Sequence, residues 1–273
     1  MNYYELTERL KKVSPDEYEY EAKILLESYT DCSVSYILSH KDEDIADERL
    51  SLALERREKH EPLQYILGMW EFYRQRYLLT RDCLIPRSDT EVLVEKAIEL
   101  LPRGAFFADF CSGSGCIGVS TLAERPDTTA LFVEKYEMTM HLTHGNAIIN
   151  KVQDRAQCIL MDLLTDDEKL AGMKFDAILS NPPYIRPEVI ETLAPEVKFE
   201  PYAALYGGED GLIFYRKIIE DYSTLVKKDG FMLLEIGYDQ AQDVTDIANA
   251  KGLTCEIIKD YGGNDRVAYI KGF

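Results

Sequence analysis

Hydrophobic residues follow two different spacings along this chain of 273 residues. Up to about residue 70, apolar residues recur every three or four positions, which is typical of amphipathic helices, and no alternating strand pattern occurs. From about residue 104 onward, short apolar runs alternate with helical patterns, as in an α/β domain with a mostly parallel sheet. The pattern predicts a small all-helical domain followed by a larger α/β domain.

A short hairpin separates the two regions. Phe72-Tyr73 and Tyr77-Leu78-Leu79 flank three polar residues, which suits two short strands joined by a turn. The expected organisation is therefore a helical domain of residues 1–70, a β-hairpin linker of residues 71–86 and an α/β domain of residues 87–273. Residues 14–17 and 88–91 each place Ser three positions before Glu, the capping-box pattern that opens a helix.

The α/β region contains five apolar runs that we expect to form the parallel sheet: residues 106–110, 130–134, 157–161, 175–180 and 231–236. Two further runs, residues 255–259 and 267–270, flank a glycine-rich turn and predict a C-terminal antiparallel pair. The expected helices between these strands are residues 115–124, 137–150, 210–226 and 239–250.

A glycine-rich loop follows the first predicted strand. Gly113, Gly115 and Gly118 fit the G-x-G-x-x-G spacing, in which small residues and a helix N-terminus let a ligand approach the backbone. Glu134 ends the second strand about 20 residues later, where a carboxylate can accept hydrogen bonds from both hydroxyls of a ribose. These residues predict a site for an adenosine-containing ligand, and the alternative is a tight glycine turn that binds nothing.

Two more carboxylates lie at predicted strand ends. Asp162 follows the third strand, near the expected adenine edge, and it fits an Asx turn or a helix cap almost as well. Asp109, in the first strand, either stabilises the glycine loop or contacts the ligand directly. We expect both residues to belong to the site.

The segment Asn181-Pro182-Pro183-Tyr184 directly follows the fourth predicted strand. The two prolines lack N–H groups and fix φ, so the turn is stiff and its carbonyl oxygens are free to accept. Together with the amide of Asn181, these acceptors can orient a planar –NH2 group for attack on a sulfonium methyl, and Tyr184 can stack on it. The segment therefore predicts methyl transfer from S-adenosylmethionine to a planar nitrogen, the alternative being a purely structural turn.

The chain is strongly acidic, with 31 basic against 49 acidic residues and a formal net charge of −18. Proteins that bind duplex nucleic acid usually cluster Lys and Arg against the phosphates, and no basic run here exceeds two residues. We therefore expect no direct nucleic-acid binding, which narrows the methyl acceptor from a nucleobase towards an amide.

The remaining compositional signals are those of a cytoplasmic protein. No apolar run approaches the ~18 residues that a membrane span needs, and the N-terminus shows no signal-peptide pattern, so no membrane partner is expected. The six cysteines contain no C-x-x-C pair, which favours reduced thiols and no metal site.

At these residues the sequence resembles the HemK/PrmC family, the glutamine methyltransferases of peptide chain release factors. The resemblance covers about residues 60–273, with residues 1–60 matching only as a helical domain of suitable size. Besides the Asn-Pro-Pro-Tyr segment, it is carried by these stretches: Glu61-Pro62-Leu63-Gln64-Tyr65-Ile66-Leu67-Gly68, Phe72-Tyr73, Leu84-Ile85-Pro86-Arg87, Thr90-Glu91, Glu200-Pro201, Ala204-Leu205, Gly207-Gly208, Asp210-Gly211-Leu212, Tyr215-Arg216 and Gly263-Asn264-Asp265-Arg266.

The resemblance implies a Rossmann-like class I methyltransferase sheet, mostly parallel with a C-terminal antiparallel hairpin, preceded by a substrate-docking helical domain. It also implies methylation of the glutamine side-chain amide in the Gly-Gly-Gln loop of bacterial class 1 release factors, with S-adenosyl-L-homocysteine as the product. By this analogy Asn181 and Pro182 hold the glutamine amide as catalytic residues, and Pro183 and Tyr184 pack around it.

The candidate cofactor-binding residues are Asp109, Cys111, Ser112, Gly113, Ser114, Gly115, Glu134, Asp162, Leu163 and Asn181. Two of them depart from the family pattern. Cys111 stands where the usual loop begins with glycine, and Leu163 stands where an aromatic residue often lies beside the adenine.

Four other functions remain open. The Asn-Pro-Pro-Tyr segment also fits methylation of glutamine in a ribosomal protein, or of an amino group in nucleic acid such as adenine N6. A nicotinamide-dependent oxidoreductase would use the same glycine loop but gives no reason for the prolines. An interaction protein with a degenerate nucleotide-binding fold is a non-enzyme alternative, and Glu134 and Asn181 argue against it.

Overall fold

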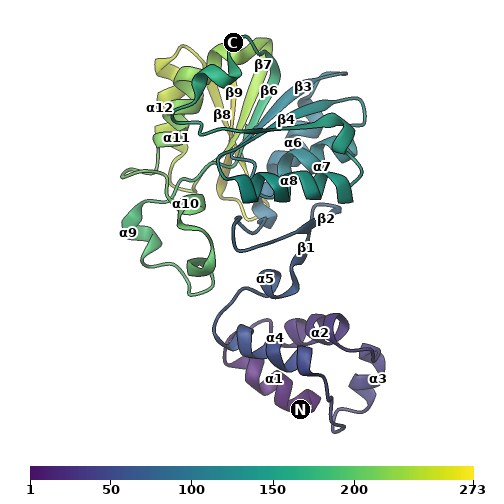
Figure 1. The fold of residues 1–273 in the computed structure, drawn as a ribbon. Coiled ribbons are helices and arrows are strands. Elements are labelled where there is room, and N and C mark those ends of the chain that lie inside the picture. Colours follow the sequence, from purple (N-terminus) through teal and green to yellow (C-terminus); the bar gives the residue numbers. More distant parts are fainter. The chain divides into compact units, whose positions relative to one another are not determined.

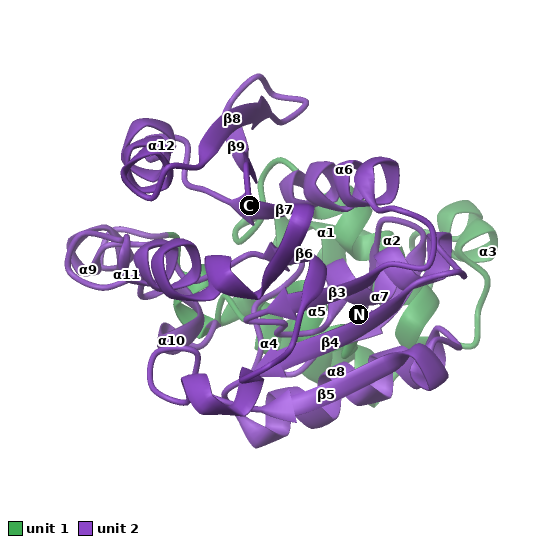
Figure 2. Cartoon of the chain, turned by 90° about the horizontal axis from the view of Figure 1, so that it is seen from above, with its two compact units in different colours: residues 1–69, 194–199 green, residues 70–193, 200–273 purple.

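The computed structural model describes residues 1–273 and divides into two compact units. The helical unit comprises residues 1–69 and 194–199, and the sheet unit comprises residues 70–193 and 200–273 (Figure 2). The short segment of residues 194–199, which lies within the α/β region of the sequence, is thus part of the helical unit.

The helical unit contains α1 (Tyr3–Lys11), α2 (Tyr18–Tyr29), α3 (Val34–Ser39), α4 (Glu48–Glu58) and α5 (Leu63–Leu67), as the periodicity predicted, with the 3₁₀ turn η4 (Val197–Phe199). Its core includes six leucines without solvent exposure: Leu6, Leu10, Leu25, Leu26, Leu50 and Leu54. The capping box predicted at residues 14–17 is wrong, because α2 begins only at Tyr18 and its N-cap Glu17 makes no side-chain hydrogen bond. A capping box occurs instead at α1, between Asn2 and Glu5.

A buried ion pair attaches residue 196 to this unit. Arg57 donates from Nε and Nη2 to the two carboxylate oxygens of Glu21 at 2.8 and 3.0 Å, and both side chains are buried. The Nη1 atom of Arg57 reaches Oε1 of Glu196 at 3.2 Å. Arg57 therefore joins α2, α4 and the segment of residues 194–199.

The sheet unit is built on seven strands in the order β5-β4-β3-β6-β7-β9-β8. Their bounds are β3 (Phe106–Phe110), β4 (Thr129–Glu134), β5 (Ala156–Leu160), β6 (Phe175–Ser180), β7 (Val226–Glu235), β8 (Thr254–Lys259) and β9 (Asp265–Lys271). Strands β3 to β7 pair in parallel, whereas β9 runs antiparallel to both β7 and β8. The mostly parallel sheet with a C-terminal antiparallel hairpin is confirmed.

Helices cover both faces of this sheet. Figures 1 and 2 show α6 (Glu91–Leu100), α7 (Cys116–Glu124) and α8 (Glu137–Ile149) on one face, and α11 (Ile213–Arg216) and α12 (Ala241–Ala250) on the other. The remaining short elements are η2 (Gln153–Arg155), η3 (Asp167–Leu170), α9 (Pro187–Ile190) and α10 (Tyr202–Leu205).

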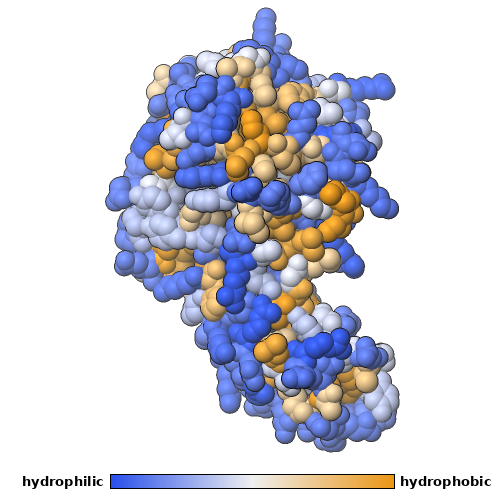
Figure 3. Space-filling model, in the orientation of Figure 1, coloured by the Kyte–Doolittle hydropathy of each residue, from blue (hydrophilic) through white to orange (hydrophobic).

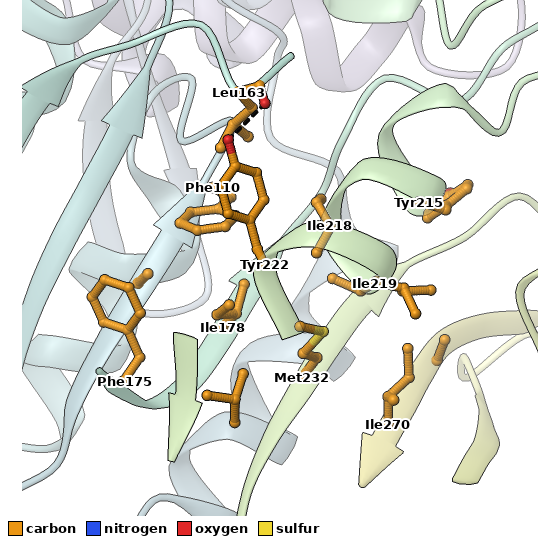
Figure 4. Packing of buried hydrophobic residues seen from close by; sticks show 14 of the residues in the cluster. Phe110, Leu163, Phe175, Ile178, Tyr215, Ile218, Ile219, Tyr222, Met232 and Ile270 are labelled. Atoms are coloured by element: carbon orange, nitrogen blue, oxygen red, sulfur yellow. Dashed lines mark hydrogen bonds between the residues drawn. The ribbon is translucent and has the colours of Figure 1, made fainter. Parts of the chain in front are cut away.

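The single helix predicted for residues 210–226 is wrong in detail. The chain there forms α11, then the π-helix η5 (Lys217–Asp221) and the 3₁₀ turn η6 (Tyr222–Leu225). This rewinding points the Tyr222 hydroxyl to the backbone carbonyl of Leu163 at 2.7 Å. In Figure 4 this bond lies beside the apolar contact between the sheet and residues 215–222, to which Phe110, Ile178, Ile218, Ile219 and Met232 contribute.

The predicted hairpin is present as β1 (Met69–Phe72) and β2 (Gln75–Leu78), which form a two-stranded sheet. The capping box predicted at residues 88–91 is wrong. Residues 88–90 form the 3₁₀ turn η1 (Ser88–Thr90), neither η1 nor α6 has a side-chain cap, and the Glu91 carboxylate instead accepts the backbone N–H of Tyr73 at 2.8 Å. The hydroxyl of Thr90 donates to the carboxyl of Glu235 at the end of β7.

Hydrophilic residues occupy much of the surface drawn in Figure 3, with apolar residues in smaller groups between them. None of the helices combines the length and the apolar character needed to cross a bilayer.

Candidate active site

A pocket of about 360 Å³ opens at the carboxyl ends of the central parallel strands, within the sheet unit. This is where ligands bind in open α/β sheets, because the loops that follow neighbouring strands diverge there. Nine of the residues predicted for the site line the pocket: Cys111, Ser112, Gly113, Ser114, Glu134, Asp162, Leu163, Asn181 and Pro183. Asp109, Gly115, Pro182 and Tyr184 are the predicted residues that are not part of this lining.

The glycine loop between β3 and α7 contains several residues in the left-handed region. Cys111, Gly113 and Gly115 have φ values of 55°, 56° and 78°. A side chain in this region costs roughly 1–2 kcal/mol, which gives a physical reason for glycine at the first position and makes Cys111 a strained exception. A Cβ on Gly113 would meet only the carbonyl oxygen of Cys111, at 3.9 Å, so this part of the loop leaves room for a ligand.

The other two glycines are needed for packing. A Cβ on Gly115 would lie 2.8 Å from Cγ2 of Thr143, and one on Gly118 would lie 2.4 Å from Cε1 of Phe132. The three glycines of the motif therefore have different roles. Gly113 faces the pocket, whereas Gly115 and Gly118 allow α7 to pack closely against its neighbours.

Asp109, in β3, connects the sheet to the helix that follows the loop. Its side chain is fully buried, and Oδ2 accepts the backbone N–H of Gly118 at 2.9 Å. Burial raises the pKa of this carboxyl well above its usual range. The hydrogen bond to Gly118 ties β3 to the first turn of α7, while Oδ1 of Asp109 is buried without a protein partner.

Two serine hydroxyls give an indication of what the pocket accepts. The Oγ atoms of Ser112 and Ser114 are buried and have no protein partner, and both residues line the pocket. Buried polar atoms are nearly always hydrogen-bonded, so unpaired hydroxyls at a pocket wall fit a ligand with polar groups.

Glu134 ends β4 and closes the same wall. Its Oε2 accepts the N–H of Gly113 at 3.0 Å, and its Oε1 accepts the N–H groups of Lys135 and Tyr136 at 2.9 and 3.0 Å. Burial raises the pKa of this carboxyl despite the three N–H donors. Since Oε2 has one backbone donor, it keeps acceptor capacity towards the pocket.

Asp162 and Leu163 form the next part of the lining. Oδ1 of Asp162 accepts the N–H of Leu164 at 3.0 Å, which is the Asx turn considered from the sequence, and Oδ2 pairs with Lys135 at 2.8 Å. Leu163 is 3% exposed and presents an apolar surface, while Tyr222 anchors its carbonyl from behind. A flat apolar group such as a purine fits this wall.

Asn181 faces the pocket from the end of β6. Its Nδ2 donates to Oγ1 of Thr90 at 3.4 Å, and Thr90 in turn donates to Oε2 of Glu235 at 2.5 Å. Tyr184 points its hydroxyl at Oε1 of the same carboxyl, 3.4 Å away, which places the tyrosine in the wall behind the turn. Gly207 packs against this turn so closely that a Cβ would lie 2.5 Å from Cα of Tyr184.

The sequence reasoning missed Thr90 and Glu235. Glu235 carried the same signal as Glu134, an acidic residue at the end of an apolar run, whereas Thr90 was interpreted as part of a capping box. It also missed the far wall of the pocket, to which α10 and α11 contribute Tyr202, Ala203, Ala204, Ile213 and Phe214.

Two family models match the chain. The PrmC N-terminal domain matches residues 4–68 and the methyltransferase small domain matches residues 88–197. Among solved structures, the catalytic domain of hMettl16 in complex with the MAT2A 3′UTR hairpin 1 superposes with a TM-score of 0.58 at 16% identity, covering 82% of this chain and 79% of that one. A methyltransferase from Pyrococcus furiosus reaches a TM-score of 0.53 at 16% identity over 72% of this chain and 89% of its own. These likenesses support the class I methyltransferase fold.

Curated relatives extend over nearly the whole chain. The release factor glutamine methyltransferase of Aquifex aeolicus is 37% identical over 272 residues, covering 98% of this chain and 95% of its own. That of Clostridium botulinum is 37% identical over 265 residues, covering 94% and 93%. The chain is therefore a methyltransferase and belongs to the release factor glutamine methyltransferase family.

Proposed function

We propose that this protein transfers a methyl group from S-adenosylmethionine to the side-chain amide nitrogen of the glutamine in the Gly-Gly-Gln loop of class 1 release factors. The observation that carries the proposal is Asn181 at the pocket wall, with its Nδ2 already engaged by Thr90. The carbonyl oxygen of its planar amide is therefore left for an –NH2 group of the acceptor. The names of the full-length relatives support a release factor as that acceptor.

The residues present fit S-adenosylmethionine. Glu134 offers acceptor capacity for ribose hydroxyls, the serines at 112 and 114 offer unpaired hydroxyls, and Leu163 offers an apolar face for adenine. When bound, S-adenosylmethionine supplies an electrophilic methyl group on a sulfonium. We assign Cys111, Gly113 and Asp162 to the same cofactor wall.

The protein's contribution to the reaction is orientation. A primary amide nitrogen is a weak nucleophile because its lone pair is delocalised into the carbonyl. Oδ1 of Asn181 and the carbonyl of Pro182 each accept one N–H of the glutamine amide, which aims the nitrogen at the methyl group and stabilises the positive charge that develops on it. Pro183 fixes the turn, and Tyr184 braces it from behind.

The helical unit serves in this proposal as the docking domain for the release factor, and the site of action is the cytoplasm. The net charge of −18 disfavours nucleic acid as the acceptor. The likeness to an RNA-bound methyltransferase domain concerns the fold and does not change this assignment.

The proposal is tested by incubating the purified protein with labelled S-adenosylmethionine and a purified release factor, followed by mass spectrometry of the Gly-Gly-Gln peptide. A release factor with this glutamine replaced by alanine is the matched control and should stay unlabelled. Ribosomes and DNA are assayed in parallel. A methyl group found on a ribosomal protein or on DNA, and not on the release factor, would overturn the acceptor assignment.

A further inference from the structure

Glu235 is an acidic residue buried directly behind the Asn-Pro-Pro-Tyr turn. It ends β7, its exposed fraction is 1%, and the pairing of Ser180 with Leu234 makes it the neighbour of Asn181 at the carboxyl edge of the sheet. A carboxyl group without water is costly to keep unless its oxygens are hydrogen-bonded. The groups that hydrogen-bond the carboxyl of Glu235 therefore indicate its role.

The two carboxyl oxygens take one hydroxyl each, from two different segments of the chain. Thr90 donates to Oε2 at 2.5 Å, and Tyr184 donates to Oε1 at 3.4 Å. Above its pKa of about 7 the carboxyl of Glu235 is ionised and can only accept, so Thr90 donates its single hydrogen there and presents only lone pairs to its other neighbours. Its neighbour on that side is Nδ2 of Asn181, at 3.4 Å.

This polarity fixes which way the Asn181 amide faces. If the amide were flipped, Oδ1 would confront the lone pairs of Thr90 Oγ1, two acceptors with no hydrogen between them. The amide therefore keeps its –NH2 group on Thr90, which leaves its oxygen for a ligand. The direction of the hydroxyl of Thr90, and hence of the amide, is set by the ionised carboxyl of Glu235.

We propose that Glu235 is a positioning residue for methyl transfer: through Thr90 it orients the amide oxygen of Asn181 towards the acceptor nitrogen, and through Tyr184 it holds the far end of the turn. The inference rests on the proposed function for the role of Asn181. Neither Glu235 nor Thr90 needs to touch the reacting atoms for this purpose, since both act through the side chain of Asn181.

A double-mutant cycle on kcat, measured above about pH 7 where Glu235 is ionised, tests this relation in the full chain. Thr90→Val removes the hydroxyl at nearly constant volume, and Glu235→Gln replaces one acceptor oxygen by a donor. We expect each to lower kcat on the order of 10- to 100-fold, the scale of misplacing a reacting group, with the Kd for S-adenosylmethionine unchanged within about twofold. Thr90→Ser, which restores a hydroxyl, should recover kcat to within a few-fold of the wild type.

The decisive measurement introduces the two substitutions into a protein that already carries Asn181→Ala. If Thr90 and Glu235 act through Asn181, then Thr90→Val and Glu235→Gln should change the residual kcat by less than about threefold there. A full multiplicative loss in that background would overturn the proposal, as would an undiminished kcat in the single variants. Thr121→Val is the matched control, because Thr121 is an equally buried threonine whose hydroxyl bonds only the carbonyl of Ile117 in its own helix.

A spectroscopic readout separates this inference from the proposed function. The side-chain ¹⁵N–¹H₂ signal of Asn181, assigned by its loss in Asn181→Ala, should shift in Thr90→Val and Glu235→Gln and stay in place in Thr121→Val. An Asn181 signal whose chemical shift is the same in Thr90→Val and Glu235→Gln as in the wild type would overturn the positioning role, even if release factors are methylated. If the protein failed to methylate release factors, the proposed function would be wrong. The side-chain signal of Asn181 would still show whether Glu235 orients the amide.

Discussion

Gly113 donates its backbone N–H to Oε2 of Glu134 at 3.0 Å, so the acidic residue that ends β4 closes the glycine loop that follows β3. The two residues are 21 positions apart and meet because β3 and β4 are parallel neighbours. Glu134 thus both shapes the loop and faces the pocket that the loop helps to form.

The main effect of Glu134→Gln should be weaker cofactor binding. Two backbone N–H groups bind Oε1, so the amide oxygen is held there and the new –NH2 group faces the N–H of Gly113, donor against donor. We expect the Kd for S-adenosylmethionine to rise on the order of 10- to 100-fold, as for a lost hydrogen bond to a charged group, measured by calorimetry. Glu137→Gln, at an exposed neighbour outside the pocket, should leave the Kd unchanged. An unaltered Kd in Glu134→Gln would remove Glu134 from the cofactor wall.

Asn181→Ala should slow methyl transfer and leave cofactor binding nearly unchanged. Its amide oxygen is proposed to act on the acceptor nitrogen, so we expect kcat to fall on the order of 10²- to 10³-fold while cofactor affinity stays nearly constant. Steady-state kinetics with a release factor as substrate, together with calorimetry for the cofactor, separate the two effects. Equal losses in both measurements would place Asn181 on the cofactor and not on the acceptor.

The strands and the glycine loop could be predicted from the sequence because their signals are local. A buried parallel strand needs an apolar run, and a loop residue with positive φ favours glycine, so both properties leave marks within a few positions. The pairing of Thr90 with Glu235 leaves no such mark, because the partners are 145 positions apart. Ser88, three residues before Glu91, predicted a helix cap. In the structure Thr90 and Glu91 are instead hydrogen-bonded to residues distant in sequence, Glu235 and Tyr73.

The same reason explains why residues 210–226 do not form the single predicted helix. Residues 210–226 carry a helical pattern, yet the backbone rewinds into a π-helix where Tyr222 bonds the carbonyl of Leu163, which is 59 positions away. The segment of residues 194–199 lies in the helical unit, where Glu196 pairs with Arg57, 139 positions away, and no periodicity in the sequence encodes that ion pair.

Gly118→Ala should destabilise the sheet unit through steric overlap. The new Cβ would lie 2.4 and 2.7 Å from the fully buried ring of Phe132 and 2.9 Å from Oδ2 of Asp109. Because neither neighbour has room to move, we expect a loss of about 1–3 kcal/mol in the free energy of unfolding, measured by urea titration. Gly145→Ala is the matched control within α8, where a Cβ meets open space, and it should gain about 0.5–1 kcal/mol. The same sign in both variants would contradict this explanation.

Arg57→Met should destabilise the helical unit. The change leaves the buried carboxylate of Glu21 without its partner, and breaking a buried ion pair in this way costs about 3–5 kcal/mol. Circular dichroism during urea titration measures the loss. Arg49→Met breaks the exposed pair with Asp47 and should cost less than about 1 kcal/mol. Equal effects of the two variants would show that burial of the Arg57 pair contributes nothing.

Glu235 should make the stability of the protein depend on pH in a definite direction. Burial raises the pKa of Glu235 from 4.5 to about 7, which outweighs the lowering by Thr90, Arg266 and Tyr184, while Asp89 adds to the rise. Between these two values the native state keeps a proton that the unfolded state has lost, so the free energy of unfolding falls as the pH rises. The contribution is fully present below about pH 4.5 and is lost by the time the pH has passed about 7.

Glu235→Gln isolates this effect, because the raised pKa values of Asp109, Glu134 and Glu200 contribute equally to both proteins and cancel in the difference. From low to high pH, the wild type should lose roughly 3 kcal/mol relative to the variant, the free-energy equivalent of such a pKa difference. Urea titrations of both proteins between about pH 5 and pH 8 give this difference directly. If it stayed constant, or grew in favour of the wild type with rising pH, the carboxyl group of Glu235 would have to be ionised at an ordinary pKa. The hydroxyls of Thr90 and Tyr184 would then be stabilising its charge at least as strongly as burial opposes it.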